Sequence, residues 1–414
     1  MNQPSSAKQL ALIGISMLLM LSPHAYTTAT DISIPNREYQ IHIRADFSAV
    51  ANNVGRADCT PVSVEVTQNR RELRELRWRA PASFQHFEAN PDLVQEDGEW
   101  IWRIEATGGT LRYCVQLSHK RGARYDALIT PEWATFRADD LFPAAASVAL
   151  KGSRSKTTLQ FILPEGWSSI TQYPETAEHV YTIANPARRF DRPTGWVQLG
   201  NLGVRRDNIA QTRVAVSAPV GQALARLELI TFLTFTLPTV RDWFPAFPDR
   251  LLVVSAQDPL WRGALSGPKS LFLHAERPLV SENGTSTVLH ELVHVAMQRQ
   301  ATKDADWIDE GLAEYLSLVL LHRAGGITER RLKKALSQQA EWGKTAKELA
   351  RKHSQAEATA KAVTVFAALH EEMGDHGFRQ LVRRLAEPGP AISAADLKRY
   401  ANTAHGKPVQ SLPY

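Results

Sequence analysis

The spacing of apolar residues changes near Pro219, and this change constrains the fold more than any other feature of the chain. Before it, short runs alternate apolar and polar side chains between clusters of Gly, Pro, Asn and Asp, a pattern typical of an antiparallel β-sandwich. After it, apolar side chains recur mostly at helical spacing. We therefore expect an α+β protein, with a β-sandwich domain at residues 30–218 and a mainly helical domain with a small sheet at residues 219–414.

Eight segments are predicted as strands of the sandwich: Tyr39–Phe47, Val62–Val66, Trp100–Ala106, Leu111–Leu117, Thr157–Leu163, Val180–Ile183, Trp196–Leu199 and Arg213–Ser217. In the second domain we expect a helix over Gln222–Thr236 and two buried strands, Leu251–Val254 and Ser270–His274. The next helix is predicted to begin near Ser286 or Thr287, which are good N-cap residues. Helices dominate from there to about residue 400.

Composition excludes several classes of protein. Hydrophobic residues make up 43% and charged residues 22% of the 414 residues, as in ordinary globular proteins and unlike disordered chains or multi-span membrane proteins. The formal net charge of +5 is mild for this length, so we do not expect nucleic acid as a partner. The oligomeric state is left open.

The first residues have the features of a cleaved secretory signal. Lys8 precedes an apolar run, Leu10–Leu21, which as a helix would span about 18 Å, short of the roughly 30 Å of a bilayer core. Small residues suit cleavage after Ala25 or Ala29. We predict a signal peptide over residues 1–29 and a periplasmic or secreted mature chain without a transmembrane segment. An uncleaved N-terminal anchor is the alternative.

The chain has two cysteines, Cys59 and Cys114, and both lie in the predicted sandwich next to predicted strands. Outside the cytoplasm, such a pair is a candidate disulfide. Two buried free thiols are the alternative, because sequence spacing does not reveal the distance between the sulfur atoms.

The motif that carries chemistry is H-E-x-x-H at residues 290–294. On a helix, His290 and His294 project from one face a turn apart and offer two nitrogen ligands to a single Zn²⁺. Glu291 lies beside them, off the metal but near enough to activate a metal-bound water as the general base. The neighbouring residues are apolar and include no proline, as a buried active-site helix requires.

A second helix with acidic residues is predicted at Trp307–Tyr315, soon after this motif. Glu310 can supply the third zinc ligand, and two His with one Glu leave a fourth position open, as in catalytic zinc sites. Glu314, one turn further on, can accept a hydrogen bond from a ligand imidazole and orient its ring. We therefore predict one Zn²⁺ per chain.

The segments H-E-L-V-H and W-I-D-E-G-L-A-E-Y resemble the gluzincin metallopeptidases of clan MA, and look most like the glycyl aminopeptidase family and its uncharacterised secreted relatives. The resemblance is specific from about Ser270 to Ile327. It implies a thermolysin-like catalytic domain behind an N-terminal β-sandwich. Carried over by position, it makes His290, His294 and Glu310 the zinc ligands and leaves Glu291 as the general base.

The sequence departs from these families at two places. Their downstream Tyr, which hydrogen-bonds the oxyanion, is replaced in the best local match by Thr359, and Tyr315, His353 or His370 are candidate substitutes. A clear G-x-M-E-N or G-G-x-E-H motif, which in the relatives anchors the free amine of the substrate, is also missing. Aminopeptidase and endopeptidase activity therefore both stay open.

The leading hypothesis is a zinc-dependent hydrolase that cleaves peptide or protein substrates by means of a zinc-bound water and Glu291. An extended substrate is expected to pair with Ser270–His274 as the edge strand of the small sheet. The alternative is a zinc-binding but catalytically weak or inactive module that binds peptides or envelope polymers. The missing Tyr favours this alternative, whereas the intact Glu291 disfavours it.

Overall fold

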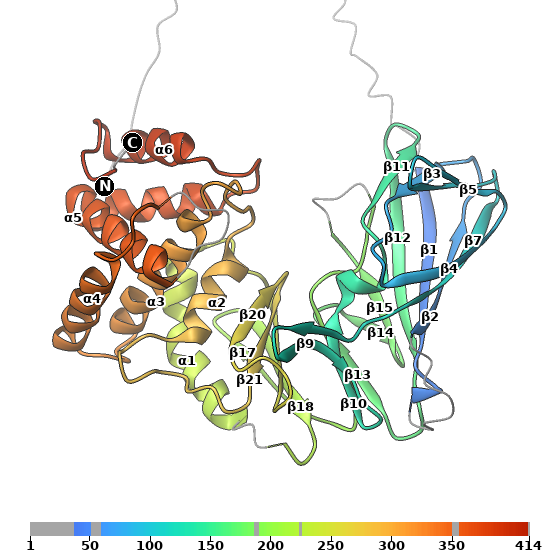
Figure 1. Ribbon diagram of the computed structural model, residues 1–414, viewed down its shortest axis with the longest axis horizontal. Coiled ribbons are helices and arrows are strands. Elements are labelled where there is room, and N and C mark those ends of the chain that lie inside the picture. Colours follow the sequence, from blue (N-terminus) through green and yellow to red (C-terminus); the bar gives the residue numbers. More distant parts are fainter. Residues whose placement is uncertain (1–36, 51–58, 186–189, 223–225, 350–355, 413–414) are drawn as a thin grey trace, which may run out of the picture. The chain divides into compact units, whose positions relative to one another are not determined.

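The computed structural model describes residues 37–50, 59–185, 190–222, 226–349 and 356–412. The predicted signal peptide lies outside these ranges. None of the helices in the described ranges is long and apolar enough to cross a lipid bilayer. The described residues form four sheets and six α-helices, and α1 lies between strands β18 and β19 in the chain (Figure 1).

The N-terminal region contains three sheets. The strand order of the largest is β14 (Glu175–Ala177), β15 (Val180–Ile183), β12 (Ser153–Ile162), β1 (Arg37–Asp46), β2 (Thr60–Thr67), β7 (Gly108–Val115) and β4 (Phe84–Asn90). A five-stranded sheet has the order β13 (Ser168–Thr171), β16 (Trp196–Gly200), β10 (Trp133–Arg137), β9 (Arg124–Ile129) and β8 (His119–Arg121). A four-stranded sheet has the order β11 (Ala145–Ala149), β3 (Leu73–Trp78), β6 (Glu99–Arg103) and β5 (Leu93–Glu96).

The inward faces of these strands form one core of apolar side chains. In β1 and β2 every second residue is buried, as the alternating sequence pattern predicted. The prediction of an antiparallel sandwich is wrong for one pair of these strands, because β1 and β12 pair in parallel. Alternation shows which face of a strand is buried but not the direction of its neighbour, and this pair is joined by a long crossover that includes β2 to β11.

Cys59 and Cys114, the candidate pair, form a disulfide with a Cα–Cα distance of 5.4 Å. Cys59 directly precedes β2, and Cys114 lies near the end of the adjacent strand β7, opposite Pro61. The bridge therefore joins neighbouring strands at one end of the largest sheet.

A fourth sheet positions the candidate site. Its order is β17 (Leu202–Ile209), β18 (Thr212–Pro219), β19 (Arg250–Ala256), β21 (Ser270–His274) and β20 (Ala264–Gly267). The domain boundary after residue 218 remains a prediction. Strands β17 and β18 come essentially before this residue in the chain, and β19, β20 and β21 come after it, yet all five belong to one sheet. The reason is that β18 pairs in parallel with β19 across helix α1, a long-range contact that local pattern does not reveal.

The prediction that Ser270–His274 is an edge strand is wrong. The segment Ser270–His274 forms β21, but this strand is interior, paired in parallel with β19 and antiparallel with β20. Each residue of β21 is buried, which a continuously apolar strand with neighbours on both sides explains. The edge is β20, whose short and partly polar sequence carried no clear strand signal.

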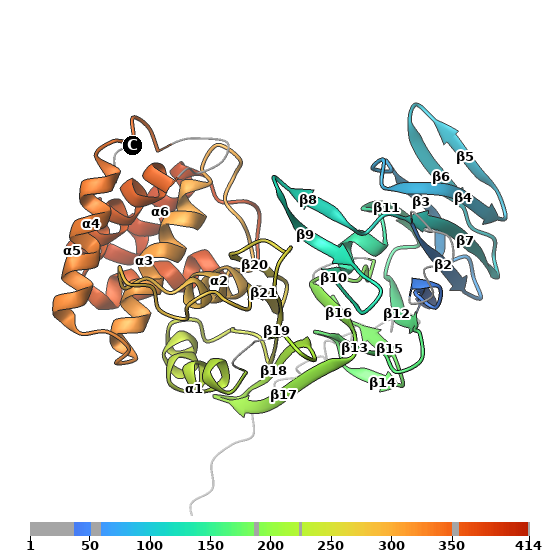
Figure 2. The same ribbon diagram turned by 60° about the horizontal axis from the view of Figure 1, so that its bottom comes forward.

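The helices follow in the order α1 (Arg226–Trp243), α2 (Thr287–Ala296), α3 (Trp307–Arg323), α4 (Glu329–Gly343), α5 (Ala356–Ala386) and α6 (Ala394–His405). They form a second apolar core with one face of the fourth sheet, and Figure 2 shows α2 next to β20 and β21. Helix α5 is interrupted at Gly374, whose φ of 67° is left-handed.

The other face of the fourth sheet packs on the five-stranded sheet. Trp133, Trp196, Val254 and Phe272 belong to a third apolar cluster at this contact. Polar groups reinforce it, since the side-chain amide of Gln198 donates to the carbonyl of Ser255 at 2.8 Å. The described residues of these two regions thus belong to one compact unit.

Candidate metal centre

Helix α2 positions the two histidines of the motif. Its N-cap is Ser286, whose hydroxyl accepts a hydrogen bond from the N–H of Leu289 at 3.4 Å, which satisfies one of the free donors of the first turn. The apolar residues of the helix are buried in the second core. His290 and His294 project together from the remaining face, with ring centroids 4.8 Å apart.

Helix α3 brings Glu310 to the same place. In its first turn, the carboxylate of Asp309 accepts a hydrogen bond from the N–H of Ala301 at 2.7 Å, which ties the loop between the two helices to α3. Gly311 lets α3 approach α5 closely, because a Cβ there would lie 2.3 Å from the Cβ of Ala362. Asp309 and Gly311, the two neighbours of Glu310, therefore fix the position of its backbone.

The side chains of His290, His294 and Glu310 converge on one point, with one ligand atom from each within 4.8 Å of the others. The two Nε2 atoms are 3.1 Å apart. The Glu310 carboxylate oxygens lie 3.4 Å from Nε2 of His290 and 3.5 Å from Nε2 of His294. Ligand atoms about 2.1 Å from a tetrahedral zinc ion are separated by about 3.4 Å, so this donor set fits zinc.

Glu314 and Gln339 support the ring of His290. The Glu314 carboxylate lies 3.1 Å from Nδ1 of His290, and it accepts a second hydrogen bond from the side-chain amide of Gln339 on α4 at 3.2 Å. A donor at Nδ1 directs the lone pair of Nε2 toward the cluster. The sequence predicted the contact of Glu314 but not that of Gln339, which lies on another helix with no pattern to link it.

The charges around the two rings favour a bound cation. Burial lowers the pKa of His290, but hydrogen bonds to Glu310 and Glu314 and the charge of Glu291 raise it to about 10. Burial and the neighbouring His290 lower the pKa of His294. Burial raises the pKa of the Glu310 carboxyl, but His290, His294 and the charge of Arg121 lower it below its ordinary value. The carboxylates around the rings thus give the cluster an environment that suits a cation such as zinc.

Glu291 lies next to the cluster without belonging to it. Its side chain is buried, it directly follows His290 on α2, and its charge acts to raise the pKa of both histidines. A carboxylate beside a metal position and outside the donor set is placed to act as a general base.

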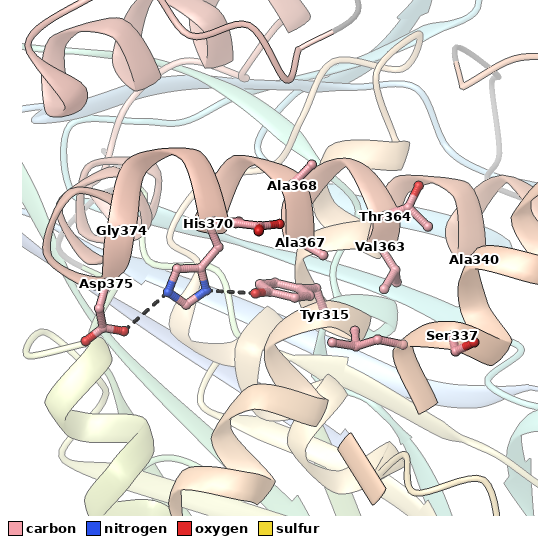
Figure 3. Close-up of a pocket in the computed structure, with 12 residues that line it drawn as sticks. Tyr315, Ser337, Ala340, Val363, Thr364, Ala367, Ala368, His370, Gly374 and Asp375 are labelled. Carbon is pink, nitrogen blue, oxygen red and sulfur yellow. Dashed lines mark hydrogen bonds and ion pairs between the residues drawn. The ribbon is translucent and has the colours of Figure 1, made fainter. Parts of the chain in front are cut away.

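Two candidate oxyanion donors are engaged with each other elsewhere. The hydroxyl of Tyr315 lies 2.7 Å from Nδ1 of His370, and Nε2 of His370 lies 3.3 Å from the carboxylate of Asp375. Figure 3 shows these three residues lining a separate cavity of about 730 Å³. Of the described residues that line it, none is one of the three candidate zinc ligands.

The remaining oxyanion candidates are Thr359 and His353. Thr359 lies in the first turns of α5, one turn before Ala362, which contacts Gly311. His353 lies outside the described residues.

Sequence reasoning also missed Arg121, on the β8–β9 hairpin of the N-terminal region, because nothing in the local sequence relates it to Glu310.

Replacing Glu314 with glutamine is expected to weaken zinc affinity by roughly 10–100-fold without abolishing binding, because the ring of His290 loses an anionic acceptor but keeps its neighbours. Competition with a chromophoric chelator measures the change. The control is Glu329→Gln, which removes an exposed carboxylate paired with Lys333. A loss as large as that caused by His294→Ala would instead make Glu314 a direct zinc ligand.

Comparison with known proteins agrees with the geometry of the site. Residues 283–377 match the family model of the M61 glycyl aminopeptidases. This segment contains both motifs and all three candidate ligands. No curated protein matches the chain by sequence.

Solved structures of M1 zinc metallopeptidases have the same fold. An aminopeptidase N family protein from Idiomarina loihiensis matches with a TM-score of 0.63 and 14% identity, over 89% of this chain and 71% of that one. The M1 zinc metallopeptidase from Deinococcus radiodurans matches with a TM-score of 0.59 and 17% identity, over 92% and 95% of the two chains. A mutant of that peptidase bound to a Tyr-Ser-Ala substrate matches with a TM-score of 0.58 and 16% identity, over 92% and 96%.

The resemblance to gluzincin peptidases that the motifs predicted is therefore confirmed. At these identities the solved structures establish a two-domain M1-type fold. The match to the M61 family supports peptidase chemistry in general terms.

Proposed function

We propose that this protein is a zinc-dependent peptidase in which His290, His294 and Glu310 hold one zinc ion and Glu291 is the general base. The observation that carries the proposal is the convergence of these three side chains at zinc-ligand separations beside a buried carboxylate. Two His and one Glu leave a coordination position for water or substrate. The M1-type fold supports a thermolysin-like catalytic domain within residues 219–414.

Each residue has a defined part in hydrolysis. A zinc ion bound at this site supplies Lewis acidity, which polarises the peptide carbonyl and makes water more acidic. Glu291 accepts the proton that water loses as its oxygen attacks the carbonyl carbon, and delivers it to the amine nitrogen as the C–N bond breaks. Glu314, supported by Gln339, keeps the His290 ring in the orientation that leaves Nε2 facing the cluster.

Strand β20 is the surface along which we place the substrate. As the edge of the fourth sheet, it has one unpaired side, and it lies next to α2, which carries the two histidines. An extended peptide can add to such an edge by main-chain hydrogen bonds. The tripeptide-bound peptidase from Deinococcus radiodurans has the same fold and supports a peptide substrate for this chain.

A second candidate function is a zinc-binding module with little or no catalytic activity, which binds peptides or envelope polymers. The observation that favours it is that Tyr315 and His370, two candidate oxyanion donors, contact each other. The best local match to the tyrosine segment of the relatives has Thr359 in place of the tyrosine. Loss of one oxyanion donor typically lowers the rate by about 10²–10³-fold.

We also propose that the mature chain acts in the periplasm or outside the cell. Two features support this location: the predicted signal peptide over residues 1–29, and the disulfide between Cys59 and Cys114, which is a feature of oxidising compartments.

Removing the metal is expected to abolish peptide hydrolysis, and adding zinc back is expected to restore it, because the donor set has no other source of Lewis acidity. The experiment incubates the chain with a mixed peptide library before and after dialysis against a chelator, and identifies products by mass spectrometry. Cleavage that survives removal of zinc contradicts the proposal. Zinc binding at one ion per chain without any cleavage favours the binding module.

A further inference from the structure

The β8–β9 hairpin carries two arginines in directly opposed positions. Arg121 and Arg124 are register partners on either side of the turn, where Gly122 adopts a φ of 65°. Like charges at opposed positions destabilise a hairpin. The opposed charges therefore do not stabilise the hairpin, and each guanidinium contacts a side chain outside it.

Arg124 is balanced by the loop that leads into β20. It forms an ion pair with Asp258, which also pairs with Arg262. The same loop is tied to the hairpin by main-chain hydrogen bonds, since the N–H of Trp261 donates to the carbonyl of Tyr125 at 2.7 Å. The hairpin is thus fastened beside the edge strand β20, as Figure 2 also shows.

Arg121 is balanced by no carboxylate within ion-pair distance among the described residues. Its guanidinium lies over the ring of Trp261, 4.9 Å from the centroid. Trp261 is 36% exposed and is one of six exposed large apolar residues in the described part of the chain. A guanidinium stacked on an indole keeps its N–H donors at the edge of its plane, where they remain available to a planar anion.

This exposed cation lies near the edge strand β20, which packs against the helix that carries the two histidines. Trp261 comes three residues before β20, and β20 packs against α2. The four residues of β20 itself, Ala264–Gly267, carry no charge.

We propose that Arg121 is a specificity-determining residue that binds a carboxylate of a peptide lying along β20. This inference rests on the proposed function for its setting, but the binding step does not require catalysis. The forked donors of the guanidinium match a carboxylate with two parallel hydrogen bonds. The carboxylate is either an Asp or Glu side chain or the C-terminus of the peptide, which present the same group.

The test measures binding of four fluorescein-labelled alanine-based hexapeptides to the Glu291→Gln chain, by fluorescence anisotropy. The peptides contain one Glu or one Gln, each with a free or an amidated C-terminus. Peptides with the recognised carboxylate are expected to bind about 10–100-fold more tightly than their neutral partners. Whether the Glu or the free C-terminus gives this preference identifies the source of the carboxylate.

Arg121→Gln in the same background is expected to remove this preference, and Arg121→Lys to keep only part of it, because lysine retains the charge but not the fork. Lys120→Gln is the matched control. It removes a cation one residue away, which lies over the ring of Tyr125 instead, and the preference is expected to persist. The thermal unfolding midpoint of each variant verifies that the fold is intact.

The inference is overturned if all four peptides bind alike, or if Arg121→Gln weakens acidic and neutral peptides equally. Turnover by the parent chain then separates the two proposals. Cleavage without any carboxylate preference leaves the peptidase standing and removes the role of Arg121. A preference that depends on Arg121, found in a parent chain that cleaves no peptide, supports the inference and contradicts the peptidase.

Discussion

Replacing His290 with alanine is expected to lower zinc affinity by more than about 100-fold and to abolish peptidase activity. The variant keeps only His294 and Glu310 as ligands, and loss of a direct ligand weakens binding more than loss of an orienting group, which costs roughly 10–100-fold. It also leaves Glu314 without the ring that it supports. Zinc content is measured by atomic absorption after dialysis, and activity by turnover of the peptide library.

The N-terminal sheets are expected to stay folded in this variant, because their core consists of other residues and is separate from the core that surrounds α2. Far-UV circular dichroism follows this part of the prediction. His376→Ala, which changes an exposed histidine on α5 that contacts Gln380, is the control and is expected to retain full zinc. An unchanged zinc content in His290→Ala would show that the metal is held elsewhere.

Replacing Glu291 with glutamine is expected to separate catalysis from metal binding. The change keeps the size of the side chain and its capacity for hydrogen bonds, but removes the group that accepts a proton. Turnover should therefore fall by at least about 10²-fold while one zinc ion per chain remains bound. Single-turnover kinetics and zinc content, measured on the same preparation, check both halves of the prediction.

Glu282→Gln is the matched control for this variant. It removes an exposed carboxylate in the loop before α2, and turnover is expected to stay unchanged. If Glu291→Gln retains the rate of the parent chain, another group accepts the proton. If the parent chain shows no turnover of any peptide, the binding-module function gains support and Glu291 loses its proposed role.

Local sequence pattern predicted most of what concerns single elements. Alternation located strands such as β2, β12 and β15, and the capping serine located the start of α2 to within a residue. The motif spacing predicted that His290 and His294 share one face. These features depend on residues a few positions apart, whose geometry is set by the repeat of the helix or the strand.

Relations between distant segments were predicted less well. The edge of the fourth sheet is β20 and not β21, the pair β1–β12 is parallel, and β18 joins a sheet with strands from the other side of residue 218. Short strands such as β8 and β20 were missed, because a few partly polar residues do not show a period. Strand order and direction follow from the packing of whole faces, on which local alternation carries no information.

For the site, local sequence predicted the three candidate zinc ligands, because the chemistry of His and Glu and their helical spacing permit few other arrangements. Only the tertiary structure decided what surrounds them. It brings Gln339 to Glu314, joins Tyr315 to His370, and places Arg121 over the ring of Trp261. The physical reason is that these partners lie on separate helices or sheets, so their distances depend on how two apolar cores pack and not on spacing along the chain.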